Sequence, residues 1–376
     1  MKPLPDFIET VLRDVKRIVI KIGTRVIDDE KTQFNQRVME SLVQEIAELK
    51  SKGIEVLLVT SGAVGAGMRE LEVPKRPVSI HLRQAYAAVG QGRLMHHYGE
   101  LFREHDITTA QVLLTRADFD RRASYLNARE TLQHLLTIGI LPIINENDTV
   151  AIDELKFGDN DFLASLVAGK MDAGLLILLT RVDGVYRSFK KDNDLIEFIQ
   201  GDFDEAFSSV HDKIDPLSMG GMRSKLEAGK AAGAKGVLVV IANGLRQGIL
   251  GNILSGCAHA TWIVPGGKRM AAWKYYLAFA KTPCGGKIMV DEGAVSAIRE
   301  SGKSLLASGV CRVIGSFERK ALVQIVDCRN NEFARGLVNY TSEELQRIQG
   351  FSSREIRRIL DRKADEVVHR NNLVLV

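Results

Sequence analysis

The sequence predicts an α/β fold with a mainly parallel sheet sandwiched by helices, followed by a small strand-rich domain. From about residue 17 to residue 265, short runs rich in Val, Ile and Leu alternate with longer helical patterns. The runs are continuously apolar, which is typical of parallel strands that are covered on both faces. After a stretch rich in Gly and Pro the rhythm of the chain changes. We therefore expect a second domain of a different kind.

The elements can be placed in order along the chain. Six apolar runs predict the strands of the first domain: 17–22, 54–60, 107–115, 139–144, 174–180 and 236–242. Helices are expected near 36–51, after the Gly-rich turn at 61–67, and over the amphipathic run 162–171. In the second domain, strands are expected at 287–290, 309–315, 321–327 and 333–340, with a helix over 291–301.

Length and composition bound the class of protein. At the usual ~150 residues per domain, a chain of 376 residues predicts two domains. We expect an N-terminal extension, a first domain, a linker and a second domain over residues 1–16, 17–265, 266–284 and 285–372. The content of 45% hydrophobic and 26% charged residues is globular. A net charge of +4 is too mild to indicate a nucleic-acid partner by itself.

The sequence also bears on location and metal binding. The longest apolar runs, such as 174–179, are too short to span a bilayer. The N-terminus carries acidic residues and lacks the apolar core of a secretory signal. Cys257, Cys284, Cys311 and Cys328 show neither paired nor metal-binding spacing. We therefore expect reduced thiols, a cytoplasmic location, no membrane contact and no metal held by protein ligands alone.

The most informative stretch is 145–161, NENDTVAIDELKFGDND. It holds two compact clusters of Asn, Asp and Glu, one at 145–148 and one at 159–161. The first cluster follows an expected strand, and the second opens an expected helix. Carboxamides and carboxylates at the end of a strand and at the start of a helix can bind the charged groups of an amino acid. They can also position a reacting lysine. This stretch therefore predicts a binding site.

Three further turns lie at the ends of expected strands or at the start of a helix, where open α/β sheets bind ligands. They are Lys21–Thr24, Thr60–Ala63 and Met219–Lys225. Free backbone amides at the start of a helix suit an anion such as phosphate. Each turn also has a purely structural interpretation: a strand-end surface charge, a tight turn and a helix entry. Their joint occurrence favours a phosphate site.

Two well-known phosphate motifs do not fit. The Gly302-Lys303-Ser304 triplet has Ala297 where the first glycine of a Walker A loop belongs. The glycines of 61–67 do not follow the G-x-G-x-x-G spacing of a dinucleotide site.

The motifs KIGT, VTSGAVGAG, AAVGQGRL, LLTRADF, NARETL, INENDTVA, FGDND, LLT and GGMRSK occur in this order. With them the chain resembles the glutamate 5-kinases, a branch of the amino-acid kinase family. The final block, from KIMVDEGA to about residue 372, resembles the PUA domain that many of these kinases carry. The resemblance implies ATP-dependent phosphorylation of the L-glutamate side-chain carboxylate to L-glutamyl 5-phosphate, the first step of proline biosynthesis.

The resemblance also implies residue roles. Lys21 and Lys225 flank the phosphates as catalytic residues, and Asp161 holds both lysines in place. Ser61, Gly62, Asp148 and Asn160 bind glutamate, with Asp148 suited to the α-ammonium group and Ser61 to a carboxylate. Mg²⁺ arrives with ATP, because Mg²⁺ favours phosphates and waters as ligands. On the nucleotide side the implied residues are Lys21, Gly23, Thr180, Arg181, Met219, Gly220, Gly221, Met222, Arg223, Ser224 and Lys225.

Two positions depart from the pattern of the family, and both lie on the nucleotide side. Arg181 stands where Asp is usual, and Met219 stands where Thr is usual before Gly-Gly-Met. Arg181 either contacts a phosphate or points into solvent. The departures bear on nucleotide affinity more than on the choice of acid.

Two alternatives stay open at this point. The first is another carboxylate or phosphate kinase of the same fold. The second is an RNA-binding protein with a degenerate kinase domain, because PUA domains occur in RNA-modifying proteins. Basic residues at 354–363 are interleaved with acidic ones, as on an ordinary solvated helix, so a structural or regulatory role of this block is favoured. The family resemblance further implies a homo-oligomer, dimer or tetramer, and feedback inhibition by proline.

Overall fold

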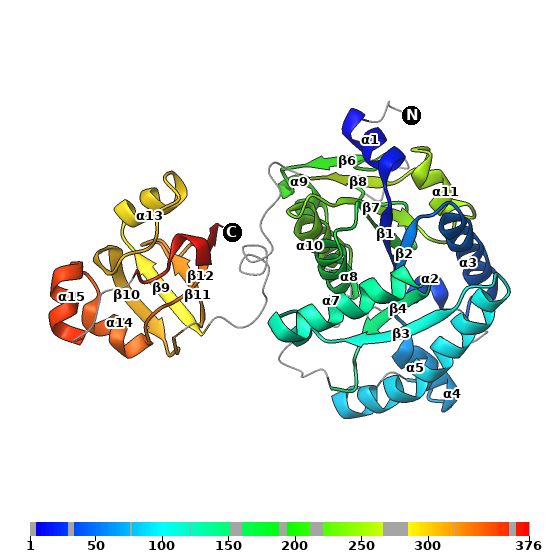
Figure 1. The fold of residues 1–376 in the computed structure, drawn as a ribbon, viewed down its shortest axis with the longest axis horizontal. Helices are drawn as coiled ribbons and strands as arrows, with labels where there is room; N and C mark the ends of the chain where they lie inside the picture. The colour runs from blue at the N-terminus through cyan, green and yellow to red at the C-terminus, as the bar shows by residue number, and fades with distance from the viewer. Residues whose placement is uncertain are drawn as a thin grey trace. The chain divides into compact units, whose positions relative to one another are not determined.

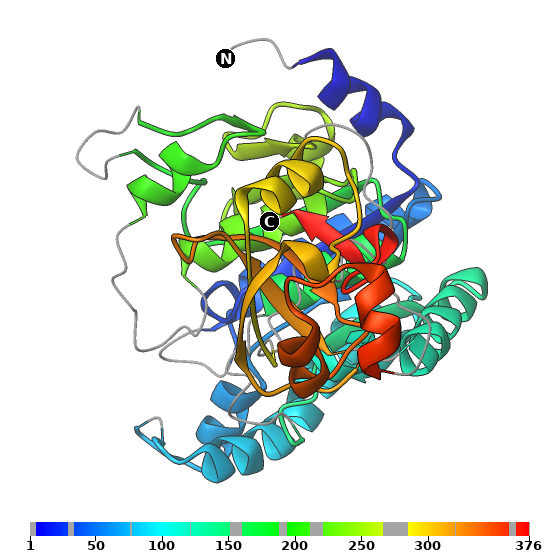
Figure 2. The ribbon, with the colours of Figure 1, turned by 90° about the vertical axis from the view of Figure 1, so that its left-hand side faces the viewer.

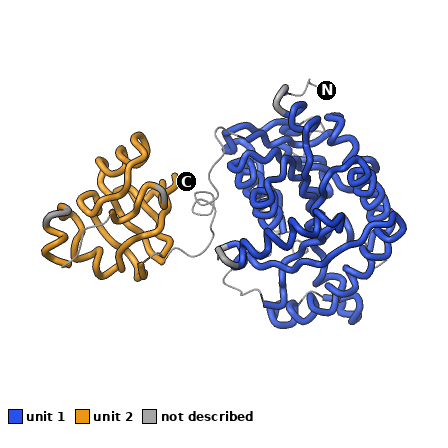
Figure 3. The backbone as a smooth tube through the Cα atoms, viewed as in Figure 1, with its two compact units in different colours: residues 1–269 blue, residues 270–376 orange. Residues whose placement is uncertain are grey.

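A computed structural model describes residues 5–28, 34–75, 77–120, 122–150, 160–187, 194–210, 221–265, 285–319, 321–360 and 366–375. The chain divides into two compact units, Met1–Arg269 and Met270–Val376, which Figure 3 shows in different colours. All of the residues that the sequence predicts for catalysis and binding belong to the first unit.

The first unit is built on an eight-stranded sheet with the order β3-β4-β2-β1-β5-β7-β8-β6 (Figure 1). Strands β1, β2, β3, β4, β5 and β7 pair with one another in parallel. Strand β8 pairs antiparallel with β7 and parallel with β6. The predicted α/β fold with a mainly parallel sheet is therefore confirmed. Two short strands, β6 and β8, were not predicted. The strand bounds are β1 Arg17–Ile22, β2 Glu55–Val59, β3 Thr109–Leu114, β4 Leu141–Glu146, β5 Leu175–Thr180, β6 Phe198–Gln200, β7 Leu238–Asn243 and β8 Thr261–Val264.

Helices cover both faces of this sheet (Figures 1 and 2). On one face, α8 and α10 pack against each other and against the central strands. On the other face lie α3, α5 and α11, which contact β2, β3 and β7 respectively. The helix bounds are α1 Asp6–Asp14, α2 Thr24–Ile27, α3 Gln36–Ser51, α4 Ala63–Glu70, α5 Ile80–Arg103, α6 Arg116–Asp120, α7 Arg122–Thr137, α8 Asn160–Lys170, α9 Asp204–Ser209, α10 Met222–Gly233 and α11 Ile249–Leu254.

The alternation of side chains along β1 assigns them to the two faces. Ile18, Ile20 and Ile22 are buried in one hydrophobic cluster with the apolar face of α3. Successive side chains of a strand point to opposite faces, so Lys21 lies on the face that α8 covers. This helix has little amphipathic character, because residues 160–169 are all buried. A polar side chain on α8 therefore needs partners inside the protein.

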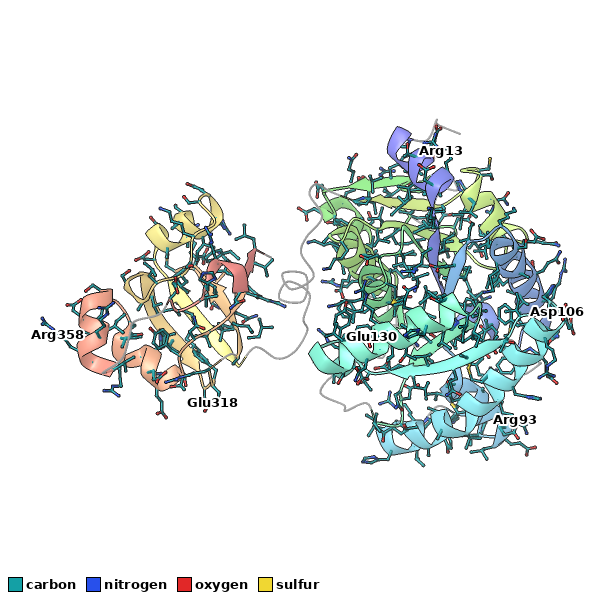
Figure 4. The ribbon with its side chains drawn as sticks, viewed as in Figure 1. Arg13, Arg93, Asp106, Glu130, Glu318 and Arg358 are labelled. Atoms are coloured by element: carbon teal, nitrogen blue, oxygen red, sulfur yellow. The ribbon has the colours of Figure 1, made fainter. Side chains whose placement is uncertain are left out.

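Helices α4 and α5 pack against each other unusually closely. A Cβ atom on Gly67 would lie 1.8 Å from the carbonyl oxygen of Tyr86, and one on Gly90 would lie 1.9 Å from that of Ala63. Only glycine fits at such a crossing. On the outer side of α5, Arg93 pairs with Glu70 of α4, and Figure 4 shows Arg93 at the surface of this unit. The crossing fixes α5 beside the end of β2.

The second unit contains a five-stranded sheet with the order β10-β9-β11-β12-β13. Its buried core includes Ile288, Val323, Phe333 and Tyr340. The strand-rich second domain expected from the sequence is confirmed. The element bounds are β9 Gly286–Val290, α13 Glu292–Arg299, β10 Val310–Gly315, β11 Leu322–Val326, β12 Glu332–Leu337, α14 Ser342–Ile348, α15 Ser353–Leu360 and β13 Leu373–Leu375.

The segment 354–363, in which basic and acidic residues are interleaved, also belongs to the second unit. Arg357 and Arg358 lie in the last turn of α15, and Figure 4 shows Arg358 at the surface of the unit. Across the described parts of both units, we find no helix with the length and apolar character needed to cross a membrane.

Candidate active site

Three charged side chains from three separate elements meet beside the end of β1. Asp161, in the first turn of α8, places Oδ1 2.6 Å from Nζ of Lys21 and Oδ2 2.9 Å from Nζ of Lys225. Lys21 comes from β1 and Lys225 from the first turn of α10. The side chain of Asp161 is 0% exposed, and both lysine side chains are 6% exposed. Such a cluster is buried and ionic, and it contains more positive than negative charge.

The local sequence explains how the three side chains converge. Lys21 faces α8 because β1 alternates, and α8 and α10 pack side by side over the central strands. A carboxylate in the first turn of a helix is favoured by the helix dipole, whereas an ammonium group there is disfavoured. Lys225 occupies such a disfavoured position, and the contact with Asp161 offsets the cost. A cation held at the positive end of a helix is a feature of a site that attracts anions.

Electrostatics fix the charge state of Asp161. Burial by itself raises the pKa of this carboxyl group, but the charges and hydrogen bonds of Lys21 and Lys225 lower it more. The resulting pKa lies well below the ordinary value of 3.8. The hydroxyl group of Ser224 lies 3.1 Å from Oδ2 of Asp161. Asp161 is therefore an ionised anchor for two cations and cannot act as a general acid near neutral pH.

A chain of buried side-chain amides runs beside this cluster. Nδ2 of Asn160 donates to Oγ of Ser61 at 2.9 Å and to Oδ1 of Asn145 at 3.1 Å. Nδ2 of Asn145 donates in turn to Oε1 of Gln91, on α5, at 2.8 Å. The backbone N–H of Glu146 donates to both asparagine oxygens, at 2.9 and 3.2 Å. The chain ends at Ser61, directly before α4.

The N-terminus of α4 is built to receive an anion. Gly62, its N-cap, has a φ of +107°, a conformation that favours glycine. The N-cap residues of α4 and α10, Gly62 and Gly221, have no side chain that could cap these helices. In contrast, the carboxylate of Glu45 accepts from the amides of Gly248, Leu250 and Gly251 around the start of α11. The first amides of a helix have no partner within the helix, so the ends of α4 and α10 can accept an anionic ligand.

The remaining residues that the sequence predicts lie around these groups. Asp148 is half-buried in the turn after β4. Thr180 ends β5, and its carbonyl accepts from the amide of Gly244 at 2.8 Å. Arg181, which follows it, is exposed. The amide of Gly23 donates to the carbonyl of Leu179 at 3.3 Å, so this strand end is tied to β5.

At the start of α10, the predicted residues are only partly within the described part of the chain. Gly221 is the N-cap and is exposed, Met222 is half-buried, and Arg223 is exposed and pairs with Glu227 at 3.7 Å. Met219 and Gly220 lie outside the described residues, as does the middle of the stretch 145–161.

Sequence reasoning missed two members of the site. Asn145 belongs to the first polar cluster but had no assigned role, although its place at the end of β4 could have indicated one. Gln91 lies on α5, 54 positions from its partner Asn145. It lies within the motif AAVGQGRL, but that motif assigns it no role, and its contact with Asn145 follows only from the fold.

The arrangement as a whole suits phosphoryl transfer to an acid. The two lysines and the end of α10 offer positive charge for phosphate groups, while Ser61, Asn160 and the end of α4 offer donors for a carboxylate. No nucleophilic side chain is required when the acceptor supplies its own oxygen. Catalysis then depends on alignment and on charge stabilisation. The fold and the site define an α/β phosphotransferase.

Comparison with known proteins makes the assignment specific. Residues 16–243 match the model of the amino acid kinase family, and residues 286–360 match that of the PUA domain. The chain belongs to the amino acid kinase family, as its motifs predict.

Several relatives match nearly the full chain. Glutamate 5-kinase of Thermoanaerobacter sp. (strain X514) is 43% identical over 364 residues, which cover 96% of this chain and 98% of the relative. Glutamate 5-kinase of Geobacter sulfurreducens is 44% identical over 370 residues, covering 97% and 99%. A more distant likeness is carbamate kinase from Giardia lamblia bound to AMP-PNP, with 17% identity, a TM-score of 0.48, and coverage of 67% of this chain and 99% of that one.

Proposed function

We propose that this chain is a glutamate 5-kinase, which transfers the γ-phosphoryl group of ATP to the side-chain carboxylate of L-glutamate. The product is L-glutamyl 5-phosphate, and the reaction is the first step of proline biosynthesis. The observation that carries the proposal is the pair of buried lysines that share the single carboxylate of Asp161. The full-length similarity to glutamate 5-kinases supports the choice of substrate.

The reaction needs little covalent help from the protein. An oxygen of the glutamate γ-carboxylate attacks the γ-phosphorus of ATP, and the bond between that phosphorus and the bridging oxygen breaks. ADP leaves with the electron pair. Negative charge spreads over the transferring group and the leaving oxygen, where Lys21 and Lys225 stabilise it. Asp161 positions both ammonium groups before the substrates arrive.

The charges of the cluster favour a phosphate-bearing ligand. Two ammonium groups converge on the carboxylate of Asp161, and both can attract a further anion. The phosphates of ATP bring negative charge to them, and the start of α10, whose N-cap is Gly221, adds backbone donors. We assign the nucleotide side to Lys21, Gly23, Thr180, Arg181 and residues 219–225. Mg²⁺ that arrives with ATP would neutralise part of the negative charge of the phosphates.

The glutamate side is assigned to Ser61, Gly62, Asp148 and Asn160. The amide of Asn160 donates to Ser61, so the hydroxyl proton of Ser61 is available for a carboxylate of the substrate. The carboxylate of Asp148 suits the α-ammonium group. An acid that lacks the α-ammonium group would lose this interaction, and we expect it to be a poor substrate.

Two properties of the assembly belong to the same proposal. We expect a homo-oligomer, which light scattering of the full chain would detect and a stable monomer would contradict. We also expect inhibition by proline, which requires that proline bind an inactive arrangement better than the active one.

We assign the kinase domain to residues 17–265 and the PUA-like domain to 285–372, with 266–284 as the linker.

The test of the proposed function is an ATP-dependent assay in which hydroxylamine traps an acyl phosphate as a hydroxamate. L-Glutamate, N-acetylglutamate, aspartate and a control without acid are compared. Hydroxamate from L-glutamate alone, lost in Lys225→Ala, is the expected result. Faster turnover of another acid would favour a different kinase of this fold, and no product with any acid would contradict the proposal.

A further inference from the structure

The buried amide chain continues beyond the residues that touch the substrate in the proposed function. Its far end is Gln91, which is 9% exposed and lies on α5, on the other side of Asn145 from Asn160. Asn145 is 1% exposed, and both Asn160 and Ser61 are 9% exposed. A run of four polar side chains this deeply buried is expensive unless their hydrogen bonds are satisfied, so its order has physical consequences.

The direction of every hydrogen bond in the chain is fixed by one backbone group. The N–H of Glu146 can only donate, and it lies 2.9 Å from Oδ1 of Asn145 and 3.2 Å from Oδ1 of Asn160. Both amide oxygens must therefore face it, and both amide nitrogens must face away. The nitrogen of Asn145 then points to Gln91, which has to accept, and the nitrogen of Asn160 points to Ser61.

This polarity determines what Ser61 can do. A hydroxyl group has one proton and two acceptor lone pairs. Because Oγ of Ser61 accepts from Asn160 at 2.9 Å, its own proton is directed elsewhere. Ser61 is thus set as a donor, which is the role that a carboxylate ligand needs. The donor role of Ser61 depends on each amide of the chain keeping its orientation.

Gln91 supplies the acceptor that keeps Asn145 in this orientation. Without Gln91, Nδ2 of Asn145 would lose this buried acceptor. Asn145 would then be held less firmly in its orientation, and so would Asn160, which donates to it. The close α4–α5 crossing at Gly67 and Gly90 holds the backbone of Gln91 in place. Nε2 of Gln91 has no hydrogen-bond partner among the described residues, so the oxygen is the end of the side chain that the protein uses.

We propose that Gln91 is a positioning residue, which acts through Asn145 and Asn160 to fix the Ser61 hydroxyl as a donor to the acid substrate. The inference rests on the proposed function, because it assigns Ser61 to the glutamate side. It predicts that Gln91 controls affinity for glutamate and has little influence on ATP or on the chemical step.

The first test compares two variants of nearly equal size. Gln91→Met removes the acceptor, and loss of one buried hydrogen bond predicts a rise of about tenfold in the KM for glutamate. The kcat and the KM for ATP should change by less than about twofold, because no group near the phosphates is altered. Gln91→Glu keeps an oxygen acceptor, and its KM for glutamate should stay within about threefold of wild type.

A matched control separates positioning from general destabilisation. Tyr98 lies on the same helix, is 1% exposed, and its hydroxyl group shares a hydrogen bond of 3.1 Å with Thr60. Tyr98→Phe also removes one buried hydrogen bond from α5, but the amide chain is untouched. We expect it to lower the melting temperature as Gln91→Met does while the KM for glutamate stays unchanged.

A double-mutant cycle decides whether Gln91 acts through Ser61. In a Ser61→Ala background, Gln91→Met should raise the KM for glutamate no further, because the donor that it sets is already gone. Independent, multiplicative effects of the two substitutions would overturn the proposal. An unchanged KM in Gln91→Met would also overturn it. If Gln91→Met does not fold, a folded Gln91→Glu variant that has lost affinity for glutamate would overturn the proposal.

The outcome can be distinguished from a failure of the proposed function. If the wild-type protein forms no hydroxamate from glutamate, the proposed function fails before any variant is compared. If the wild-type protein does so and the Gln91 variants behave like wild type, the kinase assignment stands and only the positioning role is lost.

Discussion

Removal of Asp161 should destabilise the fold more than removal of Lys225, although both substitutions lower kcat. Asp161 is fully buried between two ammonium groups, at 2.6 and 2.9 Å. Asp161→Asn would leave two buried cations without the charge that they share. Breaking a buried ionic interaction by removing one partner costs about 3–5 kcal/mol. We therefore expect Asp161→Asn to lower the free energy of unfolding by about that amount.

Lys225→Met removes a cation from the same cluster. It leaves Lys21 paired with Asp161 at 2.6 Å. Oδ2 of Asp161 keeps the nearby hydroxyl group of Ser224 at 3.1 Å. The loss should be about 1.5–3 kcal/mol, the value of one hydrogen bond to a charged group. In both variants kcat should fall by roughly 10²–10³, as for removal of one preorganised donor.

The assay is urea unfolding at neutral pH, followed by circular dichroism, together with the hydroxamate assay on the same preparations. Lys230→Met is the matched control, because Lys230 is exposed on the same helix α10. It should keep full activity and a stability within about 0.5 kcal/mol of wild type. Equal destabilisation by Asp161→Asn and Lys225→Met would refute the charge argument.

Three further predictions concern pH and helix capping. The pKa of Asp161 lies well below 3.8 in the folded protein, so the ionised carboxylate stabilises the fold above that pH. The difference in unfolding free energy between wild type and Asp161→Asn should therefore shrink as the pH falls below 3.8. A difference that stays constant would contradict this prediction. Burial raises the pKa of Tyr98 from 10 to about 12, against the weaker opposite effect of its hydrogen bond with Thr60. Wild type should therefore lose stability relative to Tyr98→Phe as the pH rises above 10, which urea unfolding on either side of that pH would measure. Glu45→Ala should cost about 1–3 kcal/mol in thermal unfolding, because three amides at the start of α11 lose their acceptor. Glu48→Ala, on the exposed side of the same helix, should cost less than about 0.5 kcal/mol, and equal losses would argue against the cap.

Continuous apolar runs were sufficient to predict most of the fold. All six strands predicted in the first unit are present, because parallel strands covered on both faces consist mainly of apolar residues. Strands β6 and β8 were missed, since they span only 3 and 4 residues. Short strands depend on their neighbours in the sheet for stability and leave little pattern in the sequence.

The site was predictable only where its residues stand at strand ends or helix starts. Lys21, Asn160 and Asp161 are such residues, and local pattern pointed to them. The partnership of Lys225 with Asp161 came from family resemblance, because the two residues are 64 positions apart and no spacing rule joins them. Gln91 lies within the motif AAVGQGRL, but the motif gave it no role, since its contact with Asn145 exists only once α5 packs against the end of β4.

The central claim is that the γ-carboxylate of glutamate is itself the nucleophile at the lysine cluster. It is tested most directly with L-glutamate that carries ¹⁸O in both oxygens of its side-chain carboxylate. After hydroxylamine cleaves the acyl phosphate at its carbonyl carbon, the released phosphate is analysed by mass spectrometry. The account predicts one ¹⁸O atom in each phosphate formed by wild type. Phosphate without ¹⁸O, in amounts equal to the ADP produced, would show that water is the acceptor and would contradict the account.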